Sequence, residues 1–402
     1  MTRAAQPRRP AGPVDLTATQ SFFAPCPRGL EAPLAAELTA LGATYIGPVD
    51  GGVAFAGGLD LAYRANLESR LASRVLWRVA HGGYRSEDDL YALVQRQDWP
   101  RHFRNDRTIR VDVAATRSPL TSLEFATLKI KDAVCDRFRA DTGARPSVDK
   151  EHADVRIHAY LTEREATLYL DTSGEPLFKR GWRRDADAAP LRENLAAGIL
   201  ALAGWSPGTP LLDPMCGGGT IPIEAALVAA DIAPGLHRSF GFQKLSWFDG
   251  PAWQRLKQKA RDRARPAPAT PSIFASDVDP RAVANARSNA AAAGVEGWIE
   301  FGVADAMTCP APGPAGLLVA NPPYGVRLES DDALAAMYPR LGDALKARFA
   351  GWTANFLTGD LRLAKLIGLK PSRRTPLWNG AIECRLFRFD IVAGRPGRDP
   401  RP

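Results

Sequence analysis

The second half of the chain alternates short apolar runs with longer helical stretches, and this alternation limits the fold more than any other sequence feature. From residue 191 onward, the apolar runs lie at 210–213, 273–277, 299–303, 317–320 and 352–358. Strands that alternate with helices in this way form βαβ units on a parallel sheet. Strand-like runs at 375–378 and 381–389 follow, joined by Asn379-Gly380, a two-residue hairpin signal. We predict an α/β, Rossmann-like, doubly wound seven-stranded sheet that ends in an antiparallel pair.

The first half of the chain has a mixed α+β pattern. A helix and a strand are expected between residues 22 and 60, a long helix at 123–139, and a hairpin of strands at 155–161 and 166–170. A length of 402 residues predicts two or three domains. We divide the chain into five segments: a flexible tail at 1–20, small α+β units at 21–65 and 66–172, a linker at 173–190, and the α/β domain at 191–402.

Composition excludes several classes of protein. Lysine and arginine number 52 against 44 acidic residues, and this net charge of +8 favours an anionic partner without identifying it. The longest apolar run, Leu195 to Trp205, is about half as long as a membrane-spanning helix requires. Neither the five separated cysteines nor the five histidines show the spacing of a disulfide framework or a metal site. We therefore expect a cytoplasmic protein without a membrane span or a metal.

Glycines cluster directly after the first strand predicted in the second half. The run reads Asp213-Pro214-Met215-Cys216-Gly217-Gly218-Gly219-Thr220, and a helix is predicted to start near Ile221. Glycines let the backbone approach a ligand closely, and the positive end of the helix would face the crevice at the carboxyl edge of the sheet. A tight strand-to-helix turn without a ligand explains the glycines equally well, so the neighbouring strands must decide.

Carboxylates follow the next two strands. Asp277 ends the second strand, where it can accept hydrogen bonds from both hydroxyls of a ribose. It lies 60 residues after Gly217, far beyond the roughly 20 residues of a dinucleotide fingerprint, so NAD binding is disfavoured. Asp279 better suits the N-cap of a helix expected at 281–293. Asp305, after the third strand, suits an adenine amino group.

The fourth strand ends in Asn321-Pro322-Pro323-Tyr324. The two prolines fix the backbone and remove two N–H donors, which leaves carbonyl oxygens and the Asn321 amide oxygen as acceptors. Such acceptors can orient an exocyclic amine so that its lone pair meets an electrophile. Tyr324 offers a face on which an extruded base could stack. A rigid turn with a surface tyrosine is the alternative, but three motifs at one sheet edge favour a site.

In this order the motifs resemble those of class I S-adenosylmethionine-dependent methyltransferases that methylate an amino group. The Met215-Cys216 pair and the runs 189–197 and 321–330 narrow the resemblance to the bacterial THUMP-domain enzymes that methylate guanine N2 in large-subunit ribosomal RNA. Residues 26–31 are similar to the ferredoxin-like opening of that family. The resemblance implies that residues 21–65 are ferredoxin-like, that 66–172 form a THUMP RNA-binding domain, and that 191–402 form the methyltransferase domain.

The resemblance implies S-adenosylmethionine as the cofactor. The residues that it implies for cofactor binding are Asp213, Met215, Cys216, Gly217, Gly219, Thr220, Asp277, Val278, Asp305, Ala306 and Asn321. The residues that it implies for catalysis are Asn321, Pro322, Pro323 and Tyr324. We assign no general base, because an alkylated aniline-like amine is acidic enough to release its proton to water.

Basic residues beside aromatic ones suit RNA, because they combine phosphate contacts with base stacking. The RNA-binding residues that we expect on this ground are Lys129, Lys131, Lys179, Arg180, Trp182 and Arg183. For the helix at 123–139, a solvated charged face is the alternative.

The function that the sequence predicts is methyl transfer from S-adenosylmethionine to the N2 of a guanosine in structured RNA, with 23S ribosomal RNA or a ribosome assembly intermediate as the partner. The alternatives are guanine N2 in transfer RNA, adenine N6, or a glutamine side chain in a protein. A non-catalytic RNA-binding assembly factor is the alternative from a different class. The sequence does not specify the oligomeric state.

Overall fold

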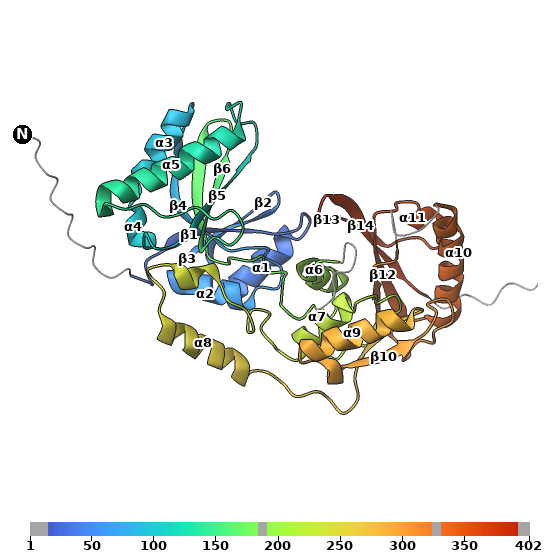
Figure 1. The fold of residues 1–402 in the computed structure, drawn as a ribbon. Coiled ribbons are helices and arrows are strands. Elements are labelled where there is room, and N and C mark those ends of the chain that lie inside the picture. The colour runs from blue at the N-terminus through green and yellow to red at the C-terminus, as the bar shows by residue number, and fades with distance from the viewer. Residues whose placement is uncertain (1–14, 184–190, 324–330, 393–402) are drawn as a thin grey trace, which may run out of the picture.

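The computed structural model describes residues 15–183, 191–323 and 331–392, with side chains from residue 336 onward in the last range, and contains two seven-stranded sheets (Figure 1). The first sheet lies in the N-terminal half and the second in the C-terminal half. Within the described residues, no helix combines the length and apolarity required to cross a membrane.

The first sheet has the strand order β2-β3-β1-β4-β7-β6-β5. Its strands are β1 (Gln20–Pro25), β2 (Thr44–Val49), β3 (Gly52–Gly57), β4 (Leu76–Gly83), β5 (Ile109–Ala115), β6 (Val155–Leu161) and β7 (Glu165–Asp171). Only β5 and β6 pair in parallel. Because β4 pairs with both β1 and β7, the sheet is continuous across residue 65, where we placed a segment boundary.

Five helices accompany the first sheet. They are α1 (Glu31–Ala40), α2 (Leu59–Glu68), α3 (Glu87–Gln95), α4 (Trp99–His102) and α5 (Leu123–Thr142). Ser122 caps α5 by accepting a hydrogen bond from the Phe125 amide, and Gly143 ends the helix in the left-handed conformation, with φ of 78°. Leucines at 30, 34 and 38 are fully buried, so α1 packs its apolar side into the core.

The second sheet has the strand order β10-β9-β8-β11-β12-β14-β13. Its strands are β8 (Leu211–Asp213), β9 (Ile273–Asp277), β10 (Ile299–Val303), β11 (Gly316–Ala320), β12 (Trp352–Thr358), β13 (Arg373–Asn379) and β14 (Ile382–Asp390). Strands β8 to β12 pair with one another in parallel, whereas β14 is antiparallel to β12 and β13. The predicted doubly wound sheet with an antiparallel end is confirmed.

The helices of this half are α6 (Glu193–Ala203), α7 (Thr220–Ala229), α8 (Gly250–Asp262), α9 (Pro280–Ala292), α10 (Asp331–Arg348) and α11 (Leu363–Leu366), with 3-10 turns at Gly241–Lys244 and Glu296–Trp298. α11 is a single short turn of four residues, and Gly368, just after its C-cap Ile367, takes a left-handed conformation with φ of 66°. Asp279 caps α9 by accepting a hydrogen bond from the Arg281 amide at 2.9 Å, as expected.

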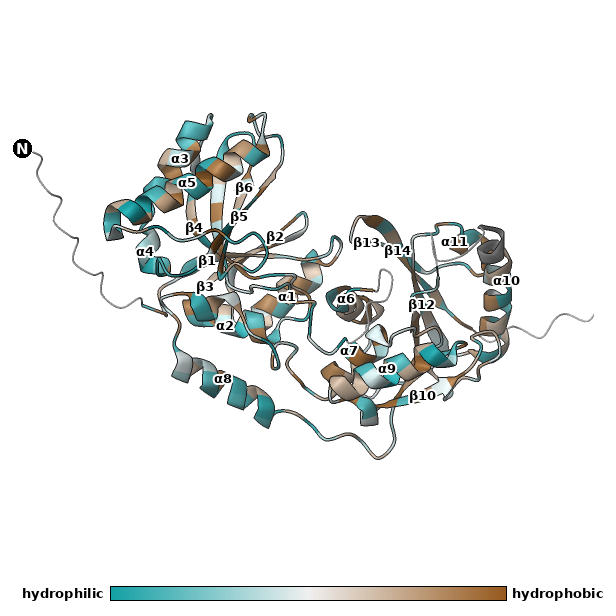
Figure 2. Cartoon of the chain, viewed as in Figure 1, coloured by the Kyte–Doolittle hydropathy of each residue, from teal (hydrophilic) through white to brown (hydrophobic). Residues whose placement is uncertain are grey.

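The segment that connects α7 to β9 reaches back to the N-terminal half, where α8 lies below α2 (Figure 1). The Tyr63 ring of α2 lies 4.7 Å from Phe242 and 5.3 Å from Trp247, centroid to centroid. The Asp249 amide also donates a hydrogen bond to the Tyr63 hydroxyl at 2.8 Å. α8 itself, which follows Asp249, is mostly hydrophilic (Figure 2). This excursion therefore joins the two halves through a buried aromatic cluster.

A buried ion pair joins the linker to α7. Arg180 Nε donates to Glu224 Oε1 at 3.2 Å, and the two side chains are 2% and 0% exposed. Other nitrogens of the same guanidinium donate to the carbonyl oxygens of Leu177 at 2.8 Å and Arg70 at 2.6 Å. Trp182 is buried as well. The expectation that Arg180 and Trp182 contact RNA is therefore wrong, because both side chains are buried and Arg180 is bonded to Glu224 and to the Arg70 carbonyl.

We predict that Glu224→Ala lowers the free energy of unfolding by about 3–5 kcal/mol, because it leaves the buried Arg180 guanidinium without its counter-charge. The matched control is Glu296→Ala, which removes a half-exposed partner of Arg287 and should cost about 0–1 kcal/mol. Urea unfolding followed by tryptophan fluorescence measures both. Equal losses in the two variants would contradict the assigned role of the buried pair.

Candidate active site

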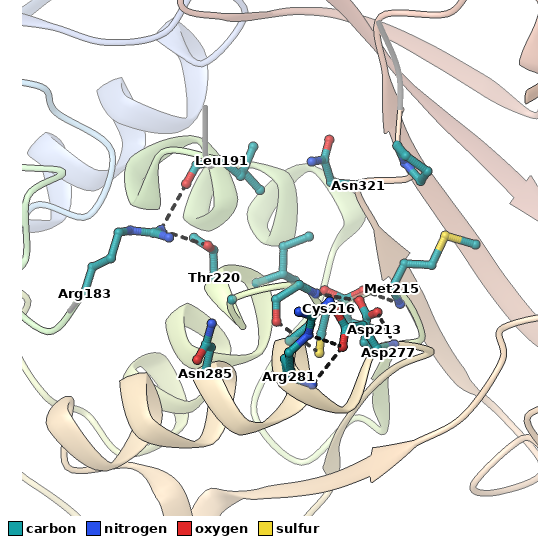
Figure 3. Close-up of a pocket in the computed structure, with 16 residues that line it drawn as sticks. Arg183, Leu191, Asp213, Met215, Cys216, Thr220, Asp277, Arg281, Asn285 and Asn321 are labelled. Carbon is teal, nitrogen blue, oxygen red and sulfur yellow. Dashed lines mark hydrogen bonds and ion pairs between the residues drawn. The ribbon is translucent and has the colours of Figure 1, made fainter. Parts of the chain in front are cut away.

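A cavity of about 850 Å³ opens at the carboxyl ends of β8, β9 and β11 (Figure 3). The residues that line it come from the turns after these strands, from the first turns of α7 and α9, and from the linker. They are Arg183, Leu191, Asp213, Met215, Cys216, Gly217, Gly218, Thr220, Ile221, Asp277, Asp279, Arg281, Ala282, Asn285, Asn321 and Pro323. The three sheet-edge motifs that the sequence predicts thus surround one cavity.

The glycine turn after β8 requires its glycines for two different reasons. Gly217 and Gly219 both have positive φ, 50° and 82°, which side chains rarely adopt. A Cβ atom at Gly219 would also lie 2.9 Å from the Cβ atom of Ala286 in α9, whereas a Cβ atom at Gly217 would meet nothing within 4 Å. Gly219 therefore permits close packing of α7 on α9, and Gly217 leaves backbone open toward the cavity.

Asp277 connects this turn to β9. Its Oδ2 accepts a hydrogen bond from the Gly217 amide at 2.9 Å, and its Oδ1 accepts one from the Asp279 amide at 3.0 Å. Each oxygen of an ionised carboxylate has a second acceptor position, so the group can still receive two donors from a ligand. The carboxylate is fixed by backbone amides on one side and faces the cavity on the other (Figure 3).

Asp213 is the most strongly perturbed acid of the cavity. The pKa of its carboxyl is raised to about 8, chiefly by burial and to a smaller extent by the nearby Asp277, while a hydrogen bond from the Met215 amide at 3.2 Å lowers it. The group is therefore largely neutral at pH 7 while no cation is bound. Burial also raises the pKa of the neighbouring Cys216 thiol, which removes it as a nucleophile.

Asn321 follows β11 and stands above the Asp213 and Asp277 carboxyl groups in the view of Figure 3. Its Oδ1 atom is buried and has no hydrogen-bond partner among the described residues. A buried acceptor without a partner costs free energy, and this cost is removed when a ligand supplies a donor. Pro322 is buried and Pro323 lines the cavity. Tyr324 lies outside the described residues.

Arg183 belongs to the cavity wall. Its Nη2 donates to Thr220 Oγ1 at 2.9 Å and to the Leu191 carbonyl at 3.3 Å, and its Nε donates to Glu193 at 3.1 Å. Sequence reasoning grouped it with the RNA-binding residues and missed its position beside α7. Arg281 and Asn285 were also missed. They lie four residues apart in the helix that Asp279 caps, so both face the same side of α9.

Asp305, Val278 and Ala306 are not among the residues that line this cavity. They lie close to it, because the Ala304 amide donates to the Asp277 carbonyl at 3.0 Å. Asp305 Oδ1 accepts a hydrogen bond from the Met307 amide at 2.8 Å, and Val278 is 70% exposed. Their assignment to the cofactor stays a prediction.

The remaining residues predicted for RNA binding each contact a carboxylate. Lys129 pairs with Asp88 at 2.9 Å, Lys131 with Asp132 at 2.6 Å, and Lys179 with Glu175 at 2.7 Å. All three keep part of their side chain exposed, so their contact with RNA stays a prediction. Among the described residues, no group of three or more His, Cys, Asp or Glu side chains is placed to hold a metal ion.

Comparison with known proteins places this geometry in context. Residues 180–388 match the family described as "RMKL-like, methyltransferase domain", residues 84–171 match the THUMP domain, and residues 21–76 match the RlmL ferredoxin-like domain. Two curated relatives are named ribosomal RNA large subunit methyltransferase K/L. The one from Shewanella baltica is 43% identical over 94% of this chain, and the one from Methylococcus capsulatus is 44% identical over 94%. The matches cover 54% and 52% of those proteins, so the chain spans about half their length.

Solved structures resemble the whole described fold. SMU.472, described as "a putative methyltransferase complexed with SAH", has a TM-score of 0.84 at 29% identity, covering 94% of this chain and 99% of its own. A possible methylase from Clostridium difficile 630 has a TM-score of 0.85 at 30% identity, covering 95% and 100%. Since the family match extends over more than half of the residues and includes every wall of the cavity, the chain belongs to the family of RMKL-like methyltransferase domains.

Proposed function

We propose that this chain transfers a methyl group from S-adenosylmethionine to the exocyclic N2 of a guanosine in large-subunit ribosomal RNA. The observation that carries the proposal is the buried, unpartnered Asn321 Oδ1 atom beside a cavity that Gly217 and Asp277 also line. The names of the curated relatives support ribosomal RNA as the substrate, and SAH in the structure of SMU.472 supports the cofactor.

The residues of the cavity fit the cofactor. The open backbone at Gly217 and the start of α7 suit its methionine moiety, and the free acceptor positions of Asp277 suit the ribose hydroxyls. Asp305 would accept from the adenine amino group. Asp213 offers a carboxyl to the ammonium group, and the Arg183 guanidinium suits the carboxylate. When bound, S-adenosylmethionine supplies an electrophilic methyl group.

The turn after β11 suits the amine. Asn321 Oδ1 and the Pro322 carbonyl are acceptors, and two acceptors hold both hydrogens of an exocyclic amine. With the hydrogens held, the nitrogen lone pair points away from the turn, and the free-energy barrier falls because the attacking atom is already oriented. The amine loses a proton after alkylation, and no side chain of the described site is required as a base for that loss.

The N-terminal half supports RNA as the substrate class. Residues 84–171 match the THUMP domain, and the chain carries a net charge of +8. Lys129, Lys131 and Lys179 keep part of their side chains exposed, and we assign them to the phosphate backbone. We propose that residues 66–172 capture structured RNA and that a target guanosine leaves its stack to enter the cavity of the second half.

The substrate class is tested by incubating the chain with labelled S-adenosylmethionine and separate RNA, DNA and protein fractions from cells that lack the gene. We expect label in large-subunit ribosomal RNA, recovered as N2-methylguanosine after digestion to nucleosides. Label in N6-methyladenine, in transfer RNA or in protein glutamine would replace the proposed substrate with that alternative. Binding of RNA without any transfer would indicate an assembly factor.

We predict that Asn321→Ala lowers the rate of methyl transfer by roughly 100- to 1000-fold, as removal of one orienting polar group does in other active sites. The dissociation constant for S-adenosylmethionine, measured by calorimetry, should stay within about threefold, because Asp213, Gly217 and Asp277 are unchanged and the proposed role of Asn321 is to orient the amine. Loss of cofactor binding together with transfer would show that Asn321 maintains the fold of the site instead.

We predict that cofactor binding at pH 7 releases a proton, because a bound cation lowers the raised pKa of the Asp213 carboxyl from its value of about 8. Affinity should therefore rise with pH until the group is ionised in the unbound chain. Calorimetry in buffers of different ionisation enthalpy measures the release. Asp213→Asn should abolish it, and an unchanged release in this variant would exclude Asp213 as the source.

A further inference from the structure

A second cavity, of about 430 Å³, lies between the two halves of the molecule. The turn between β1 and α1 contributes Arg28, the start of α6 contributes Arg192, and the β13–β14 hairpin contributes Trp378 and Gly380. The halves touch closely here, because a Cβ atom at Gly29, whose φ is 91°, would collide with the Pro376 carbonyl. We call this cavity the interdomain pocket.

The interdomain pocket presents two exposed arginines. The Arg28 guanidinium lies 5.9 Å from the centroid of the Trp378 ring and 4.0 Å from Asp50, a carboxylate that is 90% exposed. Such an exposed pair contributes little and yields easily to a stronger anion. Arg192 lies over the Phe178 ring at 4.9 Å, and it forms no ion pair with a carboxylate among the described residues. Both cations can therefore receive an anionic ligand.

The walls of the pocket combine these cations with an aromatic ring and small residues. Trp378 is half-buried, so part of its indole ring remains accessible. A Cβ atom at Gly380, which has φ of 66° in the hairpin turn, would approach Arg192 Nη2 to 3.6 Å. Guanidinium groups bind phosphate, and an indole face stacks on a base. Phosphate and base together are the chemistry of a nucleotide.

The interdomain pocket adjoins the candidate active site along the chain. Leu191 lines the active-site cavity and Arg192 lines the interdomain pocket. Arg192 has extended backbone angles, with φ of −71° and ψ of 141°, so consecutive side chains here point to opposite sides. Two consecutive residues just before α6 therefore line the two cavities.

We propose that the interdomain pocket binds the RNA nucleotide next to the one that enters the active site, with its phosphate on Arg28 and Arg192 and its base on Trp378. This inference rests on the proposed function, and it identifies where the RNA next to the target guanosine is held. It replaces the contact that the sequence assigned to Arg180 and Trp182, which are buried. Because both halves form the pocket, RNA held by the first half would be positioned for the second.

The test uses the full chain, unmodified large-subunit ribosomal RNA transcribed in vitro, and labelled S-adenosylmethionine. The variants are Arg28→Ala combined with Arg192→Ala, Trp378→Ala, and Trp378→Phe. The control is Arg340→Ala, which removes an exposed arginine on α10. Calorimetric binding of the cofactor shows that the methyltransferase half of each variant is folded.

The double arginine variant should raise KM for RNA at least tenfold and change kcat less, with the affinity for the cofactor unchanged. Its salt dependence of RNA binding should weaken by about 0.7 in logarithmic slope, which corresponds to one lost phosphate contact on a single strand. Trp378→Ala should also raise KM for RNA. Trp378→Phe should leave KM close to that of the unaltered chain, because a phenyl ring still stacks on a base.

Two outcomes overturn the proposal in distinguishable ways. If the unaltered chain methylates the RNA and the pocket variants match Arg340→Ala in KM and salt slope, the interdomain pocket does not bind the strand, and the proposed function stands. If the unaltered chain transfers no label to RNA, the proposed function and the pocket assignment both fail.

Discussion

The parallel pairing of β8 with β9 and β11 is the constraint on which the remaining structure depends. Leu211 pairs with Ile273 of β9 and with Leu317 of β11, so the carboxyl ends of three strands meet at one edge. The turn after β8 is held to β9 by a hydrogen bond from the Cys216 amide to the Ser276 carbonyl at 2.9 Å. Without this register, the glycine turn, Asp277 and Asn321 would not line one cavity.

The charges of that cavity are balanced for a ligand that carries both signs. Asp213, Asp277 and Asp279 are its acids, and Arg183 and Arg281 are its cations. Asp279 and Arg281 contact each other at the start of α9, and Arg183 is held by Glu193 and Thr220. Asp213 is left buried with no cation beside it among the residues that line the cavity, and a cationic ligand would remove the cost of ionising it.

The contacts between the halves are extensive and differ in kind. The Arg180–Glu224 pair joins the linker to α7, and the aromatic cluster around Tyr63 joins α2 to the segment before α8. A third contact, between the β1–α1 turn and β13, borders the interdomain pocket. Three separate contacts resist rotation of one half against the other better than one contact could, and the proposed transfer of RNA from one half to the other would need such a fixed arrangement.

Local chemistry determined much of this protein from sequence alone. Apolar alternation located the five parallel strands to within about one residue, because a buried strand needs apolar side chains wherever it packs. Asp279-Pro280 identified the start of α9, because an N-cap and a proline act on their own turn. The order of Asp213, Asp277 and Asn321 along the chain, each at the end of a strand, predicted their meeting at one edge.

Only the tertiary structure decided where the long polar side chains of the linker go. Arg180, Trp182 and Arg183 lie within four residues of sequence and look alike as an RNA-binding cluster, yet the first two are buried and the third lines the cavity. The sequence pattern also did not predict the return of α8 to the N-terminal half or the interdomain pocket. A strand or a cap depends on its neighbours in sequence, whereas the partner of a charged or aromatic side chain can lie a hundred residues away and is chosen by packing.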